Sequence, residues 1–133
     1  MIKWKTSWTK CEWVWVNRVL VVDDEPDVRS LIYAILVGNG FEVFQACSGE
    51  EGLVLASRLH PDLVVLDIVL PGLSGFEVCR LVKGKYPDVK VLILSALDRD
   101  VDHKYAMNYG ADGFLSKPFS VDGLLETVDS ILG

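Results

Sequence analysis

The chain has 133 residues, half of them hydrophobic, and carries a formal net charge of -6. This length suits one globular domain with a substantial core and leaves little room for a second. The acidic balance argues against direct binding of nucleic acid, because phosphate backbones are held mainly by clustered Lys and Arg.

The cysteines and the apolar segments bear on where the protein works. Cys11, Cys47 and Cys79 form an odd set without C-x-x-C spacing, so the sequence predicts neither a disulfide framework nor a zinc site. No apolar stretch approaches the roughly 20 residues that span a bilayer, and the charged N-terminus lacks the apolar core of a signal peptide. We therefore expect a cytoplasmic protein with reduced thiols and no membrane contact.

Residues 1–16 differ from the rest because they contain all four tryptophans. The run 11–16, Cys-Glu-Trp-Val-Trp-Val, has strand-forming residues that could pair with a sheet edge or another subunit. The alternative is a flexible start. Exposed aromatic area usually marks a contact surface, so we expect this Trp-rich extension to pack on the domain or on a second copy.

Apolar runs of strand length recur along the remainder, and four of them end at polar side chains. The runs and the residues after them are Val19–Val22 before Asp23 and Asp24, Leu63–Leu66 before Asp67, Val91–Leu94 before Ser95, and Phe114-Leu115 before Ser116 and Lys117. Phe41–Phe44 is a fifth, short candidate strand.

Helical periodicity occupies the gaps between these runs. The expected helices begin at Pro26, Ser48, Ser74, Asp98 and Ser120 and end near Gly38, His60, Tyr86, Tyr109 and Leu132, respectively. Ser48 with Glu51 and Ser74 with Glu77 have the spacing of capping boxes. The fourth helix is only weakly amphipathic, whereas the last has a well-formed apolar stripe.

Strands that alternate with helices and are almost wholly apolar indicate an α/β domain whose parallel sheet is covered on both faces. In such sheets, ligands bind outside the carboxyl ends of the strands. Asp23, Asp24, Asp67, Ser95 and Lys117 all follow or close expected strands, so we predict that they share one site.

The polar motifs, taken in order, resemble the receiver (CheY-like) domain of two-component response regulators. They are Val-Val-Asp23-Asp24-Glu-Pro, Leu-Asp67-Ile-Val-Leu-Pro-Gly, Leu-Ser95-Ala, and Ser-Lys117-Pro-Phe. The resemblance covers residues 17–133. It implies a single doubly wound (βα)5, flavodoxin-like domain with strand order 2-1-3-4-5.

The resemblance also implies a chemistry that these residue types can perform. A carboxylate can act as a nucleophile, and Asp67 is the expected phosphoacceptor. Phosphoryl transfer needs a divalent cation, and Mg²⁺ prefers oxygen ligands; Asp23, Asp24 and Asp67 would supply carboxylates and Val69 its main-chain carbonyl. Lys117, before an expected cis proline, would pair with a phosphoryl oxygen.

Two further residues are expected to pass the signal on. By resemblance, Ser95 turns toward the phosphoryl group and Phe114 repacks, which changes the surface from the fourth helix to the fifth. The implied partners are a sensor histidine kinase or histidine phosphotransfer protein, a downstream effector or output domain, and a homodimer formed on phosphorylation. The resemblance also places Val69 and Leu97 beside the path of an attacking water. Both side chains are apolar, so we expect slow self-dephosphorylation.

His60 and His103 are lone histidines, which we expect in surface or loop positions rather than as metal ligands or phosphodonors. The phosphoryl group should therefore come from a partner's phosphohistidine or from a small acyl phosphate. The domain would then be a signalling phosphoacceptor rather than an enzyme acting on an external substrate.

Three other interpretations compete with this one. A phosphohydrolase of the haloacid-dehalogenase kind needs a second acid two residues after the nucleophile, where this chain has Val69. A flavodoxin-like flavin binder would hold phosphate after the first strand, where Asp23, Asp24 and Glu25 would repel it. A receiver that acts by contact alone, without phosphate, stays open.

Overall fold

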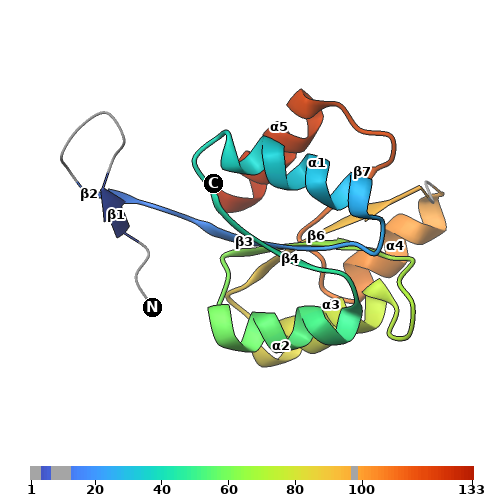
Figure 1. The fold of residues 1–133 in the computed structure, drawn as a ribbon. Helices are drawn as coiled ribbons and strands as arrows, with labels where there is room; N and C mark the ends of the chain where they lie inside the picture. The colour runs from blue at the N-terminus through green and yellow to red at the C-terminus, as the bar shows by residue number, and fades with distance from the viewer. Residues whose placement is uncertain (1–3, 7–12, 97–98) are drawn as a thin grey trace.

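The computed structural model describes residues 4–6, 13–96 and 99–133, and its main feature is a five-stranded parallel sheet (Figure 1). The strands are β3 (Arg18–Val22), β4 (Glu42–Ala46), β5 (Leu63–Asp67), β6 (Lys90–Ser95) and β7 (Gly113–Ser116). They lie in the order β4-β3-β5-β6-β7. Counted from β3, this is 2-1-3-4-5, so the predicted α/β fold is confirmed.

Five helices cover the sheet on both faces (Figure 1). They are α1 (Pro26–Val37), α2 (Gly49–Leu59), α3 (Gly75–Lys85), α4 (Asp100–Asn108) and α5 (Val121–Leu132). The helices α1 and α5 lie on one face, and α2, α3 and α4 lie on the other. Among the described residues, no helix has the length and apolar character needed to cross a membrane.

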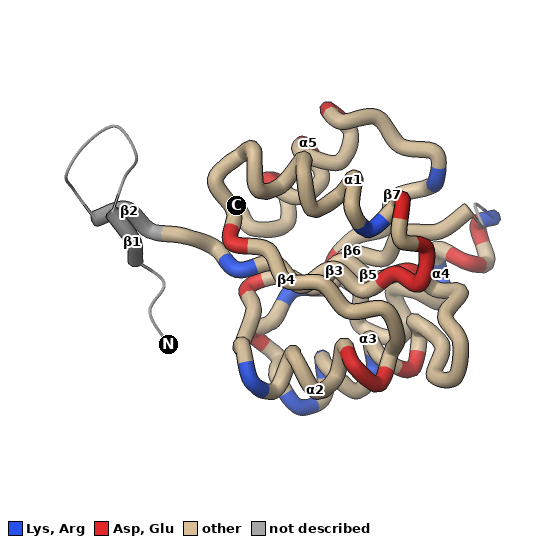
Figure 2. The backbone as a smooth tube through the Cα atoms, viewed as in Figure 1, with Lys and Arg blue, Asp and Glu red and all other residues tan. Residues whose placement is uncertain are grey.

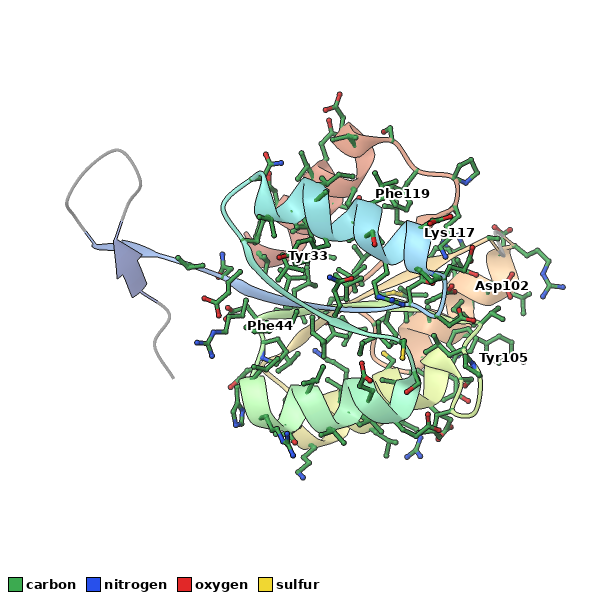
Figure 3. The ribbon with its side chains drawn as sticks, viewed as in Figure 1. Tyr33, Phe44, Asp102, Tyr105, Lys117 and Phe119 are labelled. Carbon is green, nitrogen blue, oxygen red and sulfur yellow. The ribbon has the colours of Figure 1, made fainter. Side chains whose placement is uncertain are left out.

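Successive residues of each central strand point to opposite faces, which gives two cores. In β3, Leu20 packs toward α2 and α3, whereas Val21 packs toward α1 and α5; both are fully buried. Phe44 and Phe119 mark the two cores on opposite sides of the sheet (Figure 3). Burial on both faces explains why these strands read as continuous apolar runs.

Serine side chains begin three of the helices as predicted. Ser48 Oγ accepts the N–H of Glu51 at 3.1 Å, and the Glu51 carboxylate accepts the N–H of Cys47 at 3.2 Å. Ser74 and Ser120 cap α3 and α5 in the same way. These caps fix where the helices start, and therefore the lengths of the loops that leave the carboxyl ends of the strands.

Two short strands precede the domain, β1 (Trp4–Thr6) and β2 (Trp13–Trp15). They pair with each other antiparallel in a separate two-stranded sheet, and not with an edge of the five-stranded sheet (Figure 1). The expected strand at 11–16 is therefore confirmed for its central part, while residues 11 and 12 lie outside the described residues. Packing of this extension on the domain or on a second copy stays a prediction.

Candidate functional site

The central strands bring two acidic side chains to the same edge of the sheet. Val22 and Leu66 are partners in the β3–β5 ladder, so Asp23 and Asp67, one residue further along, are neighbours. On the other side of β3, the pairing with β4 extends to Asp23, whose N–H donates to the carbonyl of Ala46 at 3.1 Å. Both acids are buried, with Asp23 1% and Asp67 5% exposed.

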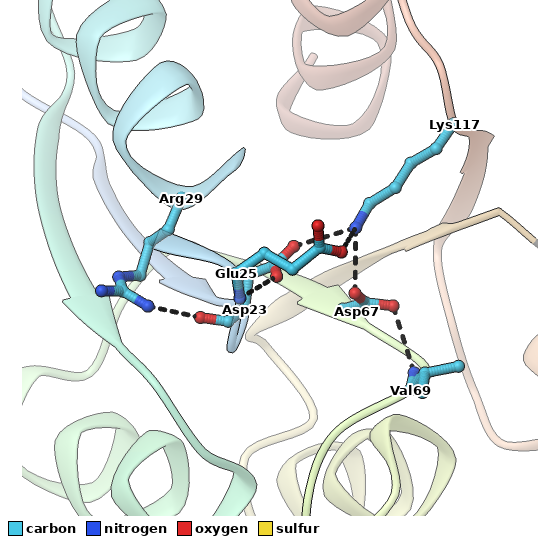
Figure 4. A network of polar contacts seen from close by, with 6 residues as sticks. All are labelled: Asp23, Glu25, Arg29, Asp67, Val69 and Lys117. Atoms are coloured by element: carbon cyan, nitrogen blue, oxygen red, sulfur yellow. Dashed lines mark hydrogen bonds and ion pairs between the residues drawn. The ribbon is translucent and has the colours of Figure 1, made fainter. Parts of the chain in front are cut away.

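Lys117 follows β7 and extends its ammonium group to both carboxylates (Figure 4). Its Nζ lies 2.9 Å from Oδ2 of Asp67 and 3.0 Å from Oδ2 of Asp23. Glu25 is more distant, with its Oε1 3.7 Å from Nζ. The structure therefore brings Asp23, Asp67 and Lys117 together, as predicted. The Lys117–Pro118 peptide bond is cis.

Main-chain groups hold the two carboxylates in place (Figure 4). The N–H of Val69 donates to Oδ1 of Asp67 at 3.1 Å, and the N–H of Glu25 donates to Oδ1 of Asp23 at 2.9 Å. Arg29 on α1 donates from Nη1 to the main-chain oxygen of Asp23 at 2.7 Å. Each carboxylate therefore accepts one hydrogen bond from a loop amide and one from Lys117, which restricts its orientation.

Burial sets the electrostatics of this edge. Desolvation raises the pKa of Asp67 above its ordinary value, and the hydrogen bond and charge of Lys117 offset only part of that effect. For Lys117, desolvation disfavours the charged ammonium, but the hydrogen bonds to Asp67 and Asp23 outweigh it and raise the pKa. Lys117 is therefore a fixed positive charge beside the Asp67 carboxylate.

The three acidic residues that gather at this edge include one that was not predicted. Asp23, Glu25 and Asp67 each offer a carboxylate oxygen, and these three atoms lie within 4.8 Å of one another. Asp24 is exposed and does not belong to this group, although it is part of the acidic segment after β3 (Figure 2). A set of hard carboxylate oxygens at this spacing fits a divalent cation such as Mg²⁺.

Glu25 is a further candidate ligand, which the sequence motifs did not single out. It occupies the position before α1 and is two residues beyond Asp23, whose side chain accepts its N–H. The signal was present in the Asp-Asp-Glu-Pro motif, where three successive acids precede the helix. The structure does not assign a ligand role to Asp24 or to the Val69 carbonyl, which stay predictions.

The two predicted switch residues lie on neighbouring strands. Ser95 is fully buried at the end of β6, and its carbonyl accepts the N–H of Lys117 at 2.7 Å. Phe114 on β7 is half-buried against the core that α3 and α4 cover. His103 on α4 is half-buried and contacts Phe114, with ring centroids 3.9 Å apart and the ring planes inclined by 30°. Its ring is therefore in part covered rather than free on the surface.

The residues expected to control the lifetime of the phosphorylated state are only partly described. The Val69 side chain is 63% exposed beside Asp67, whereas Leu97 lies outside the described residues. Slow self-dephosphorylation therefore stays a prediction. His60 is exposed in the left-handed position that ends α2, in agreement with the expected loop histidine.

Together, the sheet order and this edge define a doubly wound, flavodoxin-like domain with an acidic site where its parallel strands end. Residues 19–129 match the model of the response regulator receiver domain. The chain belongs to the response regulator receiver domain family.

Individual relatives agree with this assignment. The chain is 38% identical to the DNA-binding dual master transcriptional regulator RpaA of Synechocystis sp.. The alignment extends over 117 residues and covers 86% of this chain and 48% of RpaA. It thus spans about half the length of that relative.

Solved structures give the same result. The chemotaxis protein CheY4 of Vibrio cholerae is 30% identical with a TM-score of 0.84, over 87% of this chain and 98% of CheY4. The receiver domain of the Francisella response regulator 1452 is 31% identical with a TM-score of 0.82, over 87% of this chain and 96% of that domain.

Proposed function

We propose that this receiver domain accepts a phosphoryl group on Asp67 from the phosphohistidine of a sensor histidine kinase or histidine phosphotransfer protein. The observation that carries the proposal is the buried Asp67 carboxylate, held 2.9 Å from Lys117 at the carboxyl edge of the sheet. The domain is a signalling phosphoacceptor that catalyses only its own phosphorylation and dephosphorylation.

The chemistry follows from the contacts of Asp67. One carboxylate oxygen forms a bond to phosphorus while the bond from phosphorus to the donor imidazole nitrogen breaks, and the imidazole leaves. Lys117 stays protonated and pairs with a phosphoryl oxygen. Asp23, Asp67 and the carbonyl of Val69, with Asp24 or Glu25 completing the acidic set, would hold Mg²⁺, which would supply positive charge beside the transferring oxygens.

Phosphorylation then changes the surface from α4 to α5. Ser95 donates a hydrogen bond to the phosphoryl group, and Phe114 repacks into the space that Ser95 leaves. Support comes from the position of Ser95 on β6, next to the strand that carries Asp67, and from the contact of Phe114 with α4. We expect a Ser95→Ala variant to accept phosphate but to lose the downstream response.

The partner docks beside Lys117. An apolar hollow of about 340 Å³ adjoins the site, and its walls include Leu31 of α1, Pro118 and Phe119, together with Lys117 itself. A domain that presents phosphohistidine to Asp67 covers this hollow, because the donor must approach the same edge of the sheet. Leu31→Asp should therefore slow transfer from a protein donor and leave transfer from acetyl phosphate unchanged.

The receiver unit comprises residues 17–133, works in the cytoplasm and does not itself bind nucleic acid or membrane. Its output is a downstream effector or an attached output domain, and a homodimer formed on phosphorylation is one route to that output. RpaA is described as DNA-binding, and about half of its length lies outside the part matched here.

Chemical trapping tests the phosphoacceptor directly. Borohydride reduces an aspartyl phosphate and leaves homoserine at that position, which peptide mass spectrometry locates. After incubation with acetyl phosphate and Mg²⁺, homoserine is expected at residue 67 only. Trapping at another residue would contradict Asp67 as the phosphoacceptor, and no trapping at all would favour the alternative of a receiver that acts by protein contact without phosphate.

A further inference from the structure

The loop between β5 and α3, residues 68–74, begins directly after Asp67 and carries Val69. Its far end contacts the start of α2. The N–H of Leu73 donates to Oε1 of Glu50 at 3.1 Å, which links this loop to a helix 23 residues earlier in the chain. Glu50 therefore contacts the loop that carries the residues next to the phosphoacceptor.

The fit between Glu50 and the loop is close. Gly72 has φ +75°, and a Cβ at Gly72 would lie 2.6 Å from Glu50 Oε1. The left-handed conformation and the missing side chain at Gly72 thus allow the carboxylate to reach the N–H of Leu73. One residue earlier in α2, a Cβ at Gly49 would lie 3.0 Å from the carbonyl of Leu73.

The near end of the loop is fixed separately. The N–H of Gly75 donates to the carbonyl of Ile68 at 2.8 Å, and the N–H of Val69 donates to Asp67. Glu50 holds the opposite end. The main chain of Val69 lies between these fixed points, so its orientation depends on both.

We propose that Glu50 is a positioning residue, which holds the loop 68–74 and thereby orients the main chain of Val69 toward the cation site. The inference rests on the proposed function, because it assigns Glu50 to the same site. Glu50 is exposed and acts through Leu73 rather than by contact with the reacting groups. Its carboxylate accepts a charge-assisted hydrogen bond from the loop.

Glu51 provides a matched control. It is the next residue of α2 and experiences the same helix dipole, but it bonds the N–H of Cys47 and not the loop. Glu50→Gln provides a second comparison, because its amide oxygen can still accept the N–H of Leu73. The variants Glu50→Ala, Glu50→Gln and Glu51→Ala therefore separate the loop contact from charge at the start of the helix.

Two measurements on the full chain test the inference. Hydrogen–deuterium exchange of residues 68–74 is followed without metal, and the Kd for Mg²⁺ is obtained by calorimetry. Glu50→Ala should increase exchange in this loop and weaken Mg²⁺ binding about tenfold, as expected for loss of a group that orients a metal ligand. Glu50→Gln and Glu51→Ala should behave like the native chain.

Native Mg²⁺ affinity in Glu50→Ala would overturn the inference, whatever happens to the exchange. Equal losses in Glu50→Ala and Glu51→Ala would also overturn it, because helix charge would then be the cause. Failure of the proposed function would give a different result. The native chain and the three variants would then bind Mg²⁺ with the predicted affinities, while Asp67 would accept no phosphoryl group.

Discussion

The ammonium of Lys117 lies 2.9 Å from the carboxylate of Asp67, although 50 residues separate them in the chain. The same ammonium contacts Asp23, so one cation serves two buried anions. This edge therefore holds an excess of negative charge, which a divalent cation would neutralise. The stability and the chemistry of the domain should both respond to that imbalance.

Removal of the lysine should destabilise the metal-free protein. In Lys117→Met the carboxylates of Asp23 and Asp67 keep their burial but lose their shared cation, and we expect the free energy of unfolding to fall by about 3 kcal/mol. Urea unfolding at pH 7.5 measures this. Lys104→Met, at an exposed position of α4, is the control and should have little effect. Equal stabilities would contradict the role of Lys117 as the compensating charge.

Removal of the Asp67 charge should have the opposite effect. Burial raises the pKa of Asp67 above its value in the unfolded chain. Between these two pKa values the folded state binds more protons than the unfolded state, so the free energy of unfolding falls as pH rises through this window. At pH 7.5 the ionised carboxylate therefore lowers stability.

Asp67→Asn should thus raise the free energy of unfolding at pH 7.5 without Mg²⁺, by an amount on the order of 1 kcal/mol. The gain should shrink as pH falls toward the ordinary Asp pKa, where the native carboxyl is also neutral. Asp24→Asn, at an exposed position, is the control. A gain that is independent of pH would show that charge burial is not its cause.

Two glycines of α3 should respond in opposite ways to alanine. A Cβ at Gly75 would overlap the main-chain oxygen of Asp67 and lie 2.7 Å from the Cα of Ile68, so Gly75→Ala should cost about 3 kcal/mol. At Gly84 nothing lies within 4 Å, and Gly84→Ala should stabilise the helix by about 0.5–1 kcal/mol. Chemical unfolding of both variants measures the difference, and a mild effect at Gly75 would be inconsistent with this close approach.

Cys47 and Cys79 should differ in reactivity. Burial raises the pKa of the Cys79 thiol to about 11, so almost no thiolate forms at pH 8, whereas Cys47 is exposed. Iodoacetamide at pH 8 should alkylate Cys47 in the folded protein and reach Cys79 only after unfolding, as peptide mapping would show. Rapid labelling of Cys79 in the native state would refute its burial.

Much of the fold could be predicted because its strands are buried on both faces. A run such as Leu63–Leu66 is too short for a buried helix and too apolar for a surface strand. The serine caps at Ser48, Ser74 and Ser120 then located the helix starts, since few residue types satisfy free helix amides. The meeting of Asp23 with Asp67 followed from the parallel arrangement of their strands.

Other features depend on geometry that local patterns do not encode. Asp24 and Glu25 are both acids after the same strand, and only the path of the turn decides which side chain faces Asp67. The contact of His103 with Phe114 joins a weakly amphipathic helix to a strand, so no periodic stripe predicted it. The hydrogen bond from Leu73 to Glu50 likewise depends on how the loop after β5 lies against the start of α2.

The most direct measurement is the intact mass of the full chain after incubation with acetyl phosphate, with and without Mg²⁺, beside the variant Asp67→Ala. The account predicts a single phosphoryl adduct that requires Mg²⁺ and is missing from the variant. An adduct of equal yield on Asp67→Ala, or no adduct on the native chain under any condition, would contradict phosphorylation at Asp67.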